Sequence, residues 1–372
     1  MKKVTDIIEI ITICALVLAF AVGFWVLPDR AFSGKENRTL EQFPKFTWEY
    51  NAGSGWTFTS KIGKYFADQF PLRDGFIGIK AYSELAAARL ENNGVVKCGQ
   101  VLVPHPESSE KTLERNTKSI SVFAKNTGKP VTLAILPRPC DVWADKLPAV
   151  YDKAADKKIW ESFGEKCAEY SLESADAYSL LCGSGLYYRT DHHYTTAGAY
   201  EVYKMLGEYL GYEPYSEDFF ERVTVANDFC GTSMRTSGFY LTKKDTFELW
   251  RYEGDEDYDI VADGKDIPLY DMSKVTEQGE RSTDKYAVFL GGNHSRVDIT
   301  KGEGRPRLLL VRDSYADALA PFLSLHYDLT MLDPRYYQRS YTEIVSECDA
   351  TLVLMSMEEL SDGVSLGYLE LK

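Results

Sequence analysis

The sequence contains no cluster of basic residues, and this absence argues against one large class of function. Its 372 residues include 42 Lys or Arg against 56 Asp or Glu, which gives a formal net charge of −14. Such a surface repels phosphate backbones, whereas nucleic-acid-binding proteins present a basic patch. We therefore predict that the protein has no nucleic-acid partner.

Patterns that would hold a metal are also lacking. None of the seven cysteines shows a CxxC or Cys/His spacing typical of zinc sites. Cys14 lies in an apolar run, and the other six are either buried free thiols or disulfides whose pairing the sequence leaves open. With 44% hydrophobic residues, the chain can bury a core without disulfides. We expect no metal and no cofactor.

A long apolar run near the N-terminus predicts a membrane helix. Residues 7–27 are almost uninterrupted, which is about the twenty residues needed to cross a bilayer. Lys2 and Lys3 precede the run, so residues 1–28 are predicted to be a cytoplasmic start and a membrane anchor, with the remaining chain outside the cytoplasm. A signal peptide cleaved after Ala19-Phe20-Ala21 is the alternative, but the run is longer than a typical one.

After the anchor, the sequence divides into a stalk and one large domain. Residues 29–57 show no regular period and are predicted to be the stalk. Residues 58–90 are predicted to be helical, and Phe70-Pro71-Leu72-Arg73-Asp74 starts a second helix there. The domain is expected to span residues 58–372.

Continuous apolar segments alternate with helical ones in this domain. Strands are predicted at 101–103, 131–136, 307–311, 327–332 and 350–355, and helices at 110–126, 154–170 and 196–209, the last with Thr195 or Thr196 as its cap. Such strands indicate an α/β fold with a mostly parallel sheet and helices on both faces. Residues 219–284 are acidic and rich in turns, and we interpret them as an insertion with edge strands.

Asp191-His192-His193 is the first candidate site. The chain has only five histidines, and two are adjacent here, just before a predicted helix. On an extended backbone Asp191 and His193 lie on one face, so Asp191 can accept the ring N–H of His193 and leave the other nitrogen as a base. His192 would then point away and could bond a backbone group. A structural His pair and a pair of metal ligands are the alternatives.

Ser314 is the second candidate. It follows the strand 307–311 and precedes a helix, at the carboxyl end of the sheet, where open α/β sheets bind ligands. The N–H groups at the start of a helix also suit a developing oxyanion. Because Asp and Ser are preferred N-caps, a purely structural role is the alternative.

The turn Gly291-Gly292-Asn293-His294 is the third candidate. Glycine lets a backbone approach a ligand closely, and the Asn293 side chain can donate to an oxyanion. An ordinary tight turn is the alternative.

Together these segments resemble the DHHW family. Asp191-His192-His193-Tyr194 corresponds to the family signature, with Tyr in place of the usual Trp. The later blocks of the family, and its earlier ones from about Phe32 onward, have counterparts in Gly292-Asn293-His294, Asp313-Ser314-Tyr315, Asp333-Pro334-Arg335-Tyr336-Tyr337, Glu36-Asn37-Arg38 and Asp68-Gln69-Phe70-Pro71-Leu72-Arg73. The family is related to the SGNH-hydrolase-like proteins that acetylate alginate and other exported polysaccharides. The order of the motifs implies a circularly permuted SGNH-hydrolase-like fold.

The resemblance implies roles for the candidate residues. It makes Ser314 the nucleophile, His193 the base and Asp191 the orienting acid, with His192 in support. It also implies an acyl donor, a polysaccharide acceptor and a partner, a polytopic membrane-bound O-acyltransferase. The residues expected to hold the oxyanion or contact substrate are Asn293, Gly292, Tyr315, Arg335 and Tyr336.

Three functions are consistent with these residues. The first is O-acyl transfer, most simply of acetyl, to hydroxyls of a cell-wall or secreted polysaccharide. The second is a carbohydrate esterase that uses the same triad with water as the acceptor. The third is a non-catalytic protein that binds or assembles envelope polysaccharide. The sequence alone does not separate the first two, because the difference lies in groove shape and water access.

Overall fold

Strands that are apolar along their whole length lie at the centre of the molecule. A computed structural model of the chain describes residues 2–33, 38–48, 50–51, 55–276 and 284–369. Its main sheet has eight strands in the order β13-β12-β14-β16-β15-β17-β8-β9. These are β8 (Val131–Leu136), β9 (Ser174–Ala175), β12 (Asp259–Ala262), β13 (Lys265–Asp266), β14 (Arg296–Thr300), β15 (Arg307–Arg312), β16 (Asp328–Leu332) and β17 (Ala350–Ser356). The run from β16 to β9 is parallel, whereas β14, β12 and β13 extend the sheet in antiparallel fashion. The prediction of an α/β fold with a mostly parallel sheet is confirmed.

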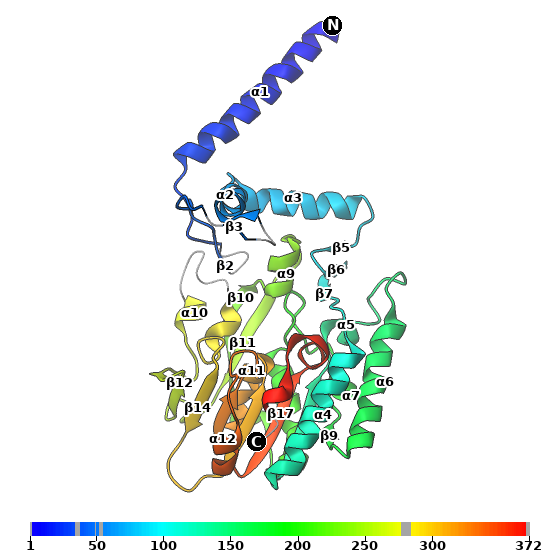
Figure 1. The fold of residues 1–372 in the computed structure, drawn as a ribbon, viewed down its shortest axis with the longest axis vertical. Helices are drawn as coiled ribbons and strands as arrows, with labels where there is room; N and C mark the ends of the chain where they lie inside the picture. The colour runs from blue at the N-terminus through cyan, green and yellow to red at the C-terminus, as the bar shows by residue number, and fades with distance from the viewer. Residues whose placement is uncertain (1, 34–37, 49, 52–54, 277–283, 370–372) are drawn as a thin grey trace.

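Helices cover both faces of the sheet, as Figure 1 shows. Neighbouring residues of β15 enter different cores: Leu308 and Leu310 belong to one apolar cluster, and Leu309 and Val311 to the other. This alternation follows from the two-residue period of a strand, and it explains why β15 is apolar at every position. The first cluster includes α8 (Thr196–Leu210) and α11 (Tyr315–Leu323), and the second includes α4 (Glu110–Thr127), α6 (Lys153–Tyr170) and α12 (Thr342–Glu347).

Helix α8, which follows the His segment, begins at the cap that its sequence specifies. The side chain of Thr195 accepts a hydrogen bond from the backbone N–H of Gly198, so Thr195, and not Thr196, caps α8. Helix α8 ends at Gly211, which takes the left-handed conformation common after a last helical turn. The start of α8 is thereby fixed close behind His193.

The acidic segment 219–284 forms two substructures. A hairpin of β10 (Glu221–Phe229) and β11 (Asp245–Arg251) encloses α9 (Thr232–Ser237), and β12 and β13 form an edge of the main sheet. The pairing β12–β14 joins this segment to the sheet, and the sequence analysis did not predict β14. Residues 277–283 of the segment lie outside the described residues.

The N-terminal part consists of three helices and small hairpins. Helix α1 (Lys2–Val26) projects from the body in Figure 1, and its residues Val4–Val26 are long and apolar enough to cross a membrane. Helices α2 (Thr57–Asp68) and α3 (Arg73–Ala86) flank the predicted break at Phe70. The segment before α2 holds β1 (Phe32–Ser33), β2 (Arg38–Thr39), β3 (Tyr50–Asn51) and β4 (Gly55–Trp56). Glu36 and Asn37, which carry part of the family resemblance, lie outside the described residues.

The remaining elements connect these parts. A three-stranded sheet links α3 to α4, and short helices precede α6 and α8. They are β5 (Glu91–Asn92), β6 (Val95–Cys98), β7 (Val101–Pro104), α5 (Pro139–Val142), α7 (Ala177–Leu181) and α10 (Ser273–Thr276), with single turns η1 (Glu217–Phe219), η3 (Lys285–Val288), η4 (Glu359–Gly363) and η5 (Leu366–Leu369). All seven cysteines are free thiols.

Candidate functional site

Ser314 lies between the end of β15 and the start of α11. The preceding residue, Asp313, holds this turn: its carboxylate accepts hydrogen bonds from the backbone N–H groups of Tyr315 at 3.0 Å and of Ser356 at 2.7 Å. The side chain of Ser314 makes no capping bond. Its hydroxyl is therefore available for other partners, which weakens the interpretation of Ser314 as a simple N-cap.

The Ser314 hydroxyl meets the first candidate segment. Ser314 Oγ lies 2.8 Å from His193 Nε2, and His193 Nδ1 lies 2.6 Å from Asp191 Oδ1. Asp191 and His193 are both buried, and Ser314 is half-buried. Since Asp191 accepts at Nδ1, that nitrogen carries the proton and Nε2 is left to accept a proton from Ser314. The geometry is that of a Ser-His-Asp relay.

Asp191 is fixed by the acidic insertion as well as by His193. Its Oδ2 accepts a hydrogen bond of 2.6 Å from the backbone N–H of Thr232, at the start of α9. A Cβ on the neighbouring Gly231 would lie 2.2 Å from Asp191 Cβ, so only glycine fits there. Neither Gly231 nor Thr232 was predicted from the sequence, because their segment carries no local signal that it approaches Asp191.

The electrostatics of the segment favour an ionised Asp191. Burial opposes the charge, but the two adjoining imidazoles and the hydrogen bond from His193 hold the pKa of Asp191 well below its usual range. Burial, followed by the neighbouring His193, lowers the pKa of His192 to about 4. His192 is therefore neutral at neutral pH.

His192 does not point away from the site as predicted. Its ring lies against that of His193, with centroids 3.9 Å apart, and it lines the cavities beside Ser314. The prediction assumed an extended backbone, but residues 189–193 form successive bends. Asp191 Oδ1 also accepts the backbone N–H of His193, a turn-forming bond typical of Asp. Within the described residues no backbone group bonds the His192 ring.

Three tyrosines surround the relay. The ring of Tyr286 stacks on that of His193, with centroids 3.8 Å apart and planes within 9°, and its hydroxyl donates to the Ser314 carbonyl at 3.2 Å. Tyr194, at the position where the family signature has Trp, donates to the carbonyl of Tyr315 at 2.6 Å. Tyr315 donates to the carbonyl of His192. Tyr286 was missed, because nothing in its own sequence neighbourhood marks it.

Two cavities reach Ser314. One, of 320 Å³, is lined by His193, Tyr286, Gly292 and Asn293 among others, which brings the predicted glycine-asparagine turn to the serine. In that turn the Gly292 N–H already donates to the Phe289 carbonyl, so the Asn293 side chain is the better oxyanion donor.

The other cavity, of 340 Å³, holds carboxylates. Its lining includes His192, Tyr315, Glu358 and Glu359, and burial is the main cause that raises the pKa of both glutamates, that of Glu359 to about 7. Neither glutamate was predicted from the sequence as a site residue. This cavity therefore offers hydrogen-bonding oxygens, and one of its carboxyl groups, that of Glu359, titrates near neutral pH.

Arg335 lines both cavities, but Tyr336 does not belong to either. The Arg335 guanidinium donates two hydrogen bonds to the Asp333 carboxylate, of 2.7 Å and 2.9 Å, and a third to the Glu359 carboxylate, of 3.2 Å. Tyr336 is 53% exposed, and its ring lies near the Arg335 guanidinium outside the cavity lining. The structure therefore places Arg335, and not Tyr336, beside Ser314.

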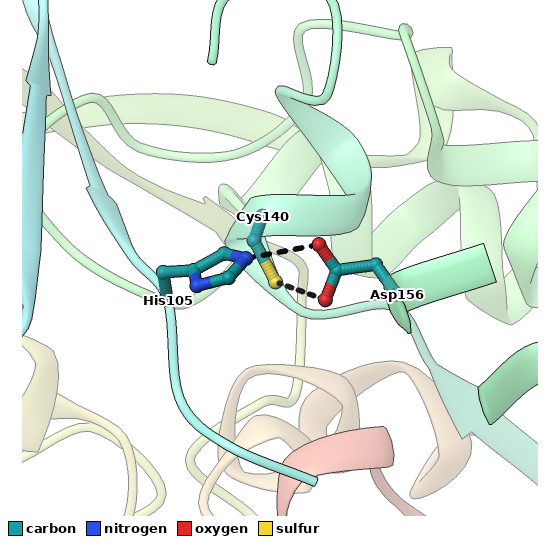
Figure 2. Close-up of side chains that lie close together, drawn as sticks. All are labelled: His105, Cys140 and Asp156. Atoms are coloured by element: carbon teal, nitrogen blue, oxygen red, sulfur yellow. Dashed lines mark hydrogen bonds and ion pairs between the residues drawn. The ribbon is translucent and has the colours of Figure 1, made fainter. Parts of the chain in front are cut away.

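A second polar cluster, shown in Figure 2, includes His105, which also lines the 340 Å³ cavity. His105 Nε2 lies 2.9 Å from Asp156, and the Cys140 thiol lies 3.9 Å from the same carboxylate. These three residues could each offer a ligand atom to a metal. However, Arg138 already donates to Asp156 at 2.8 Å, and burial raises the pKa of Cys140 well above its usual range. A protonated thiol and a paired carboxylate are poor ligands, so we assign the cluster a structural role.

The low pKa of His192 predicts a stability loss in acid. An unfolded histidine titrates near 6.5, so between about pH 6.5 and pH 4 the unfolded state binds more protons than the folded state at this residue. The stabilisation is complete above pH 6.5 and declines as pH falls through this window. We expect the thermal midpoint of His192→Gln to fall less steeply there than that of the wild type. Equal slopes for the two proteins, measured by thermal unfolding in detergent, would contradict this expectation.

Comparisons with known proteins give a family match over part of the chain and a likeness in fold over most of it. Residues 160–331 match the DHHW protein family, which confirms the resemblance over this part of the chain. A DHHW family protein from Eubacterium siraeum DSM 15702 is 19% identical, with a TM-score of 0.61 over 75% of this chain and 96% of that one. Bacillus cereus PatB1, in a structure with a sulfonyl adduct, is 15% identical, with a TM-score of 0.60 over 74% and 98%. A second PatB1 structure is 16% identical, with a TM-score of 0.56 over 72% and 97%. No curated protein matches the sequence.

Proposed function

We propose that this chain, which matches the DHHW family over residues 160–331, transfers acyl groups through a covalent intermediate on Ser314. One observation carries the proposal: Ser314 Oγ, both nitrogens of His193 and Asp191 form a continuous hydrogen-bonded chain beside two cavities. A structural serine has no need of an oriented base. The arrangement is the one required to activate a weak hydroxyl nucleophile.

In the first half of the reaction Ser314 takes the acyl group from the donor. His193 Nε2 accepts the hydroxyl proton while Ser314 Oγ attacks the acyl carbonyl. The negative charge that forms on the carbonyl oxygen is held by the backbone N–H of Ser314, at the start of α11, and by the Asn293 side chain. The intermediate then collapses, and the leaving group takes the proton from His193.

In the second half an acceptor hydroxyl takes the place of the leaving group. His193 accepts its proton, the acceptor oxygen attacks the acyl carbon of acyl-Ser314, and Ser314 Oγ recovers a proton from His193. Asp191, held by its bonds to His193 and Thr232, stabilises the imidazolium in both halves. We propose acetyl as the acyl group and a cell-wall or secreted polysaccharide as the acceptor.

The N-terminal helix is the basis for proposing where in the cell the protein acts. We propose that α1 is a membrane anchor and that the α/β body lies outside the cytoplasm, since Lys2 and Lys3 precede the span. Residues 1–28, 29–57 and 58–372 then serve as anchor, stalk and catalytic domain, with the insertion at about 219–284 supporting Asp191. The acyl donor would be supplied by a polytopic membrane-bound O-acyltransferase, as the family resemblance implies.

An acyl-enzyme experiment tests this function. Full-length protein in detergent is mixed with an activated acetyl ester, and mass spectrometry locates the acetyl group. We expect the label on Ser314, and we expect an oligosaccharide acceptor to discharge it faster than water does. Ser346→Ala, which removes an exposed hydroxyl on α12, serves as the matched control and should label normally. Discharge at one rate with and without acceptor would indicate an esterase, and no label on Ser314 would refute the mechanism.

Tyr286 is expected to position His193. Tyr286→Phe keeps the stacked ring and loses the hydroxyl that donates to the Ser314 carbonyl, so kcat should fall about fivefold, the effect of one hydrogen bond. Tyr286→Leu loses the ring as well and should lower kcat by up to a further factor of about ten. Steady-state kinetics would show a change in kcat with KM nearly constant. A change confined to KM would assign Tyr286 to substrate binding.

A further inference from the structure

Helix α3 carries exposed apolar side chains beside the end of α1. Leu72 and Ile79 are 75% and 61% exposed, and Phe76 lies between them in the sequence. Phe76 and Ile79, three residues apart, lie on one side of the helix, and Leu72 is its N-cap residue, in the left-handed conformation. We call these three residues the α3 apolar face. Together with Phe70 and with Leu27, just after α1, they line a mainly apolar cavity of 650 Å³.

The other side of α3 packs on the body. Ala81 is fully buried in a cluster with Phe239, and a Cβ on Gly78 would lie 3.3 Å from the ring of Tyr240. The helix is therefore apolar on two sides: one packs on the body, and on the other Phe76 contacts α1 while Leu72 and Ile79 stay largely exposed. A helix that is apolar on two sides is typical of one with a second apolar environment.

Contacts with α1 indicate how deep the α3 apolar face would lie in the bilayer that α1 crosses. The ring of Phe20 lies 5.4 Å from that of Phe70 and 5.5 Å from that of Phe76. Phe20 is six residues before Val26, the end of the candidate span, which corresponds to about 9 Å of helix. The 23 residues of the span exceed a hydrocarbon core of about 30 Å by only a few ångströms. The rings that contact Phe20 therefore lie at the level of the lipid.

Hydrogen bonds hold α1 and α3 in this relation. Just after α1, Asp29 accepts from the Tyr65 hydroxyl at 3.0 Å, and the Arg30 N–H donates to the Gln69 side chain at 2.9 Å. The Gln69 amide also donates to the carbonyl of Glu41 at 3.0 Å. The chain that leaves α1 is thus bonded to α2 and to the turn before α3, and it is not a free tether.

The charge of this region fits a lipid surface. Residues 57–89 hold five Lys or Arg and three Asp or Glu, in a chain whose net charge is −14. Basic residues beside a membrane span are attracted to anionic headgroups, although Arg73 is already paired with Asp68 and Asp74. Charge alone does not choose between anionic headgroups and an acidic protein surface, so the choice of a bilayer rests on the contacts of this face with the span of α1.

We propose that the α3 apolar face lies in the lipid–water interface of the membrane that α1 crosses, where it contacts phospholipid acyl chains. The proposal rests on the assignment of α1 as an uncleaved anchor. In this arrangement α3 lies along the membrane, and the α/β body is held below it at one height and orientation, as the view in Figure 1 illustrates. The site at Ser314 then faces its substrates from a fixed position.

Photo-crosslinking in native membranes tests the proposal. Benzoylphenylalanine replaces Leu72, or Ile79, in the full-length chain, and the irradiated protein is analysed by mass spectrometry for lipid adducts. The control position is Tyr368, an exposed aromatic residue of η5, which packs on α4 in the α/β body. We expect phospholipid adducts at positions 72 and 79 and none at position 368.

Each other outcome overturns the proposal in a recognisable way. Adducts to a second protein or a second copy of the chain, without lipid, would show that α3 forms a protein interface. The absence of any adduct in a protein that resists alkaline extraction would remove the α3 contact and leave the anchor intact. A chain whose mass lacks α1 would remove the anchor and the α3 contact together, without bearing on the chemistry of Ser314.

Discussion

Replacing Ser314 with alanine is expected to lower kcat for acyl transfer by a factor of about 10⁶, the scale seen when the nucleophile of a Ser-His-Asp relay is removed. The hydroxyl oxygen forms the covalent bond to the acyl group, and no neighbouring side chain can replace it at the end of the His193 hydrogen bond. The expected effect on stability is small, because Ser314 is half-buried and its side chain does not cap α11.

The same experiment distinguishes a relay from independent contributions. His193→Ala should cost about as much as Ser314→Ala, and the double variant should be no slower than either, because the residues act as one unit. Single-turnover kinetics with an activated ester would measure the three rates. Rates for the double variant that equal the product of the single effects would contradict the relay. The thermal midpoints of all variants serve as the control for folding.

Gly231→Ala is expected to lower kcat by a factor of about 10⁴, although residue 231 touches no substrate. Its Cβ would lie 2.2 Å from Asp191 Cβ and 2.6 Å from Asp191 Cα, and backbone atoms cannot rotate away. Asp191 or α9 must therefore move, which breaks the bond from the Thr232 N–H and turns Asp191 away from His193. The loss of the orienting carboxylate from such a relay costs about 10⁴ in kcat.

Two further variants make this result specific. Gly164→Ala changes a helical glycine with open space around its Cβ, and it should keep full activity. Asp191→Asn should match Gly231→Ala in kcat, and combining the two should add little. Full activity in Gly231→Ala, in a protein with an unchanged thermal midpoint, would show that the contact between α9 and Asp191 does not matter to the reaction.

Local sequence patterns were enough to predict the main elements of the sheet. The strand at β15 is apolar at every position because both of its sides are covered, and this marks a parallel strand of an α/β fold without any knowledge of its partners. Strand β14 was not predicted, because Arg296–Thr300 is only half-buried and its place in the sheet depends on pairing with β12 and β16. Long-range pairing of this kind leaves little trace in the strand itself.

In the candidate site, too, local contacts could be predicted from the sequence and long-range contacts could not. Asp191 and His193 are two residues apart, so their bond is local and could be predicted. The meeting of His193 and Ser314 joins residues 121 positions apart and was inferred only through the family resemblance. Tyr286 and Thr232 could not be predicted, because each reaches the site from a segment with no motif of its own. The predicted orientation of His192 was wrong, because the backbone forms a turn there and is not extended as assumed.

The alternating burial of β15 makes this strand intolerant of insertions and deletions. Leu308 and Leu310 enter one core and Leu309 and Val311 the other, and the strand is followed at once by the turn that presents Ser314. Inserting or deleting one codon in the strand would exchange the two sets of side chains and rotate the serine by half a turn about the strand axis. Substitutions between aliphatic residues would be tolerated far better. A library of single-codon insertions and deletions should therefore yield no active variants with changes in β15. Changes of length in the loops at the end of the sheet away from Ser314 should be accepted.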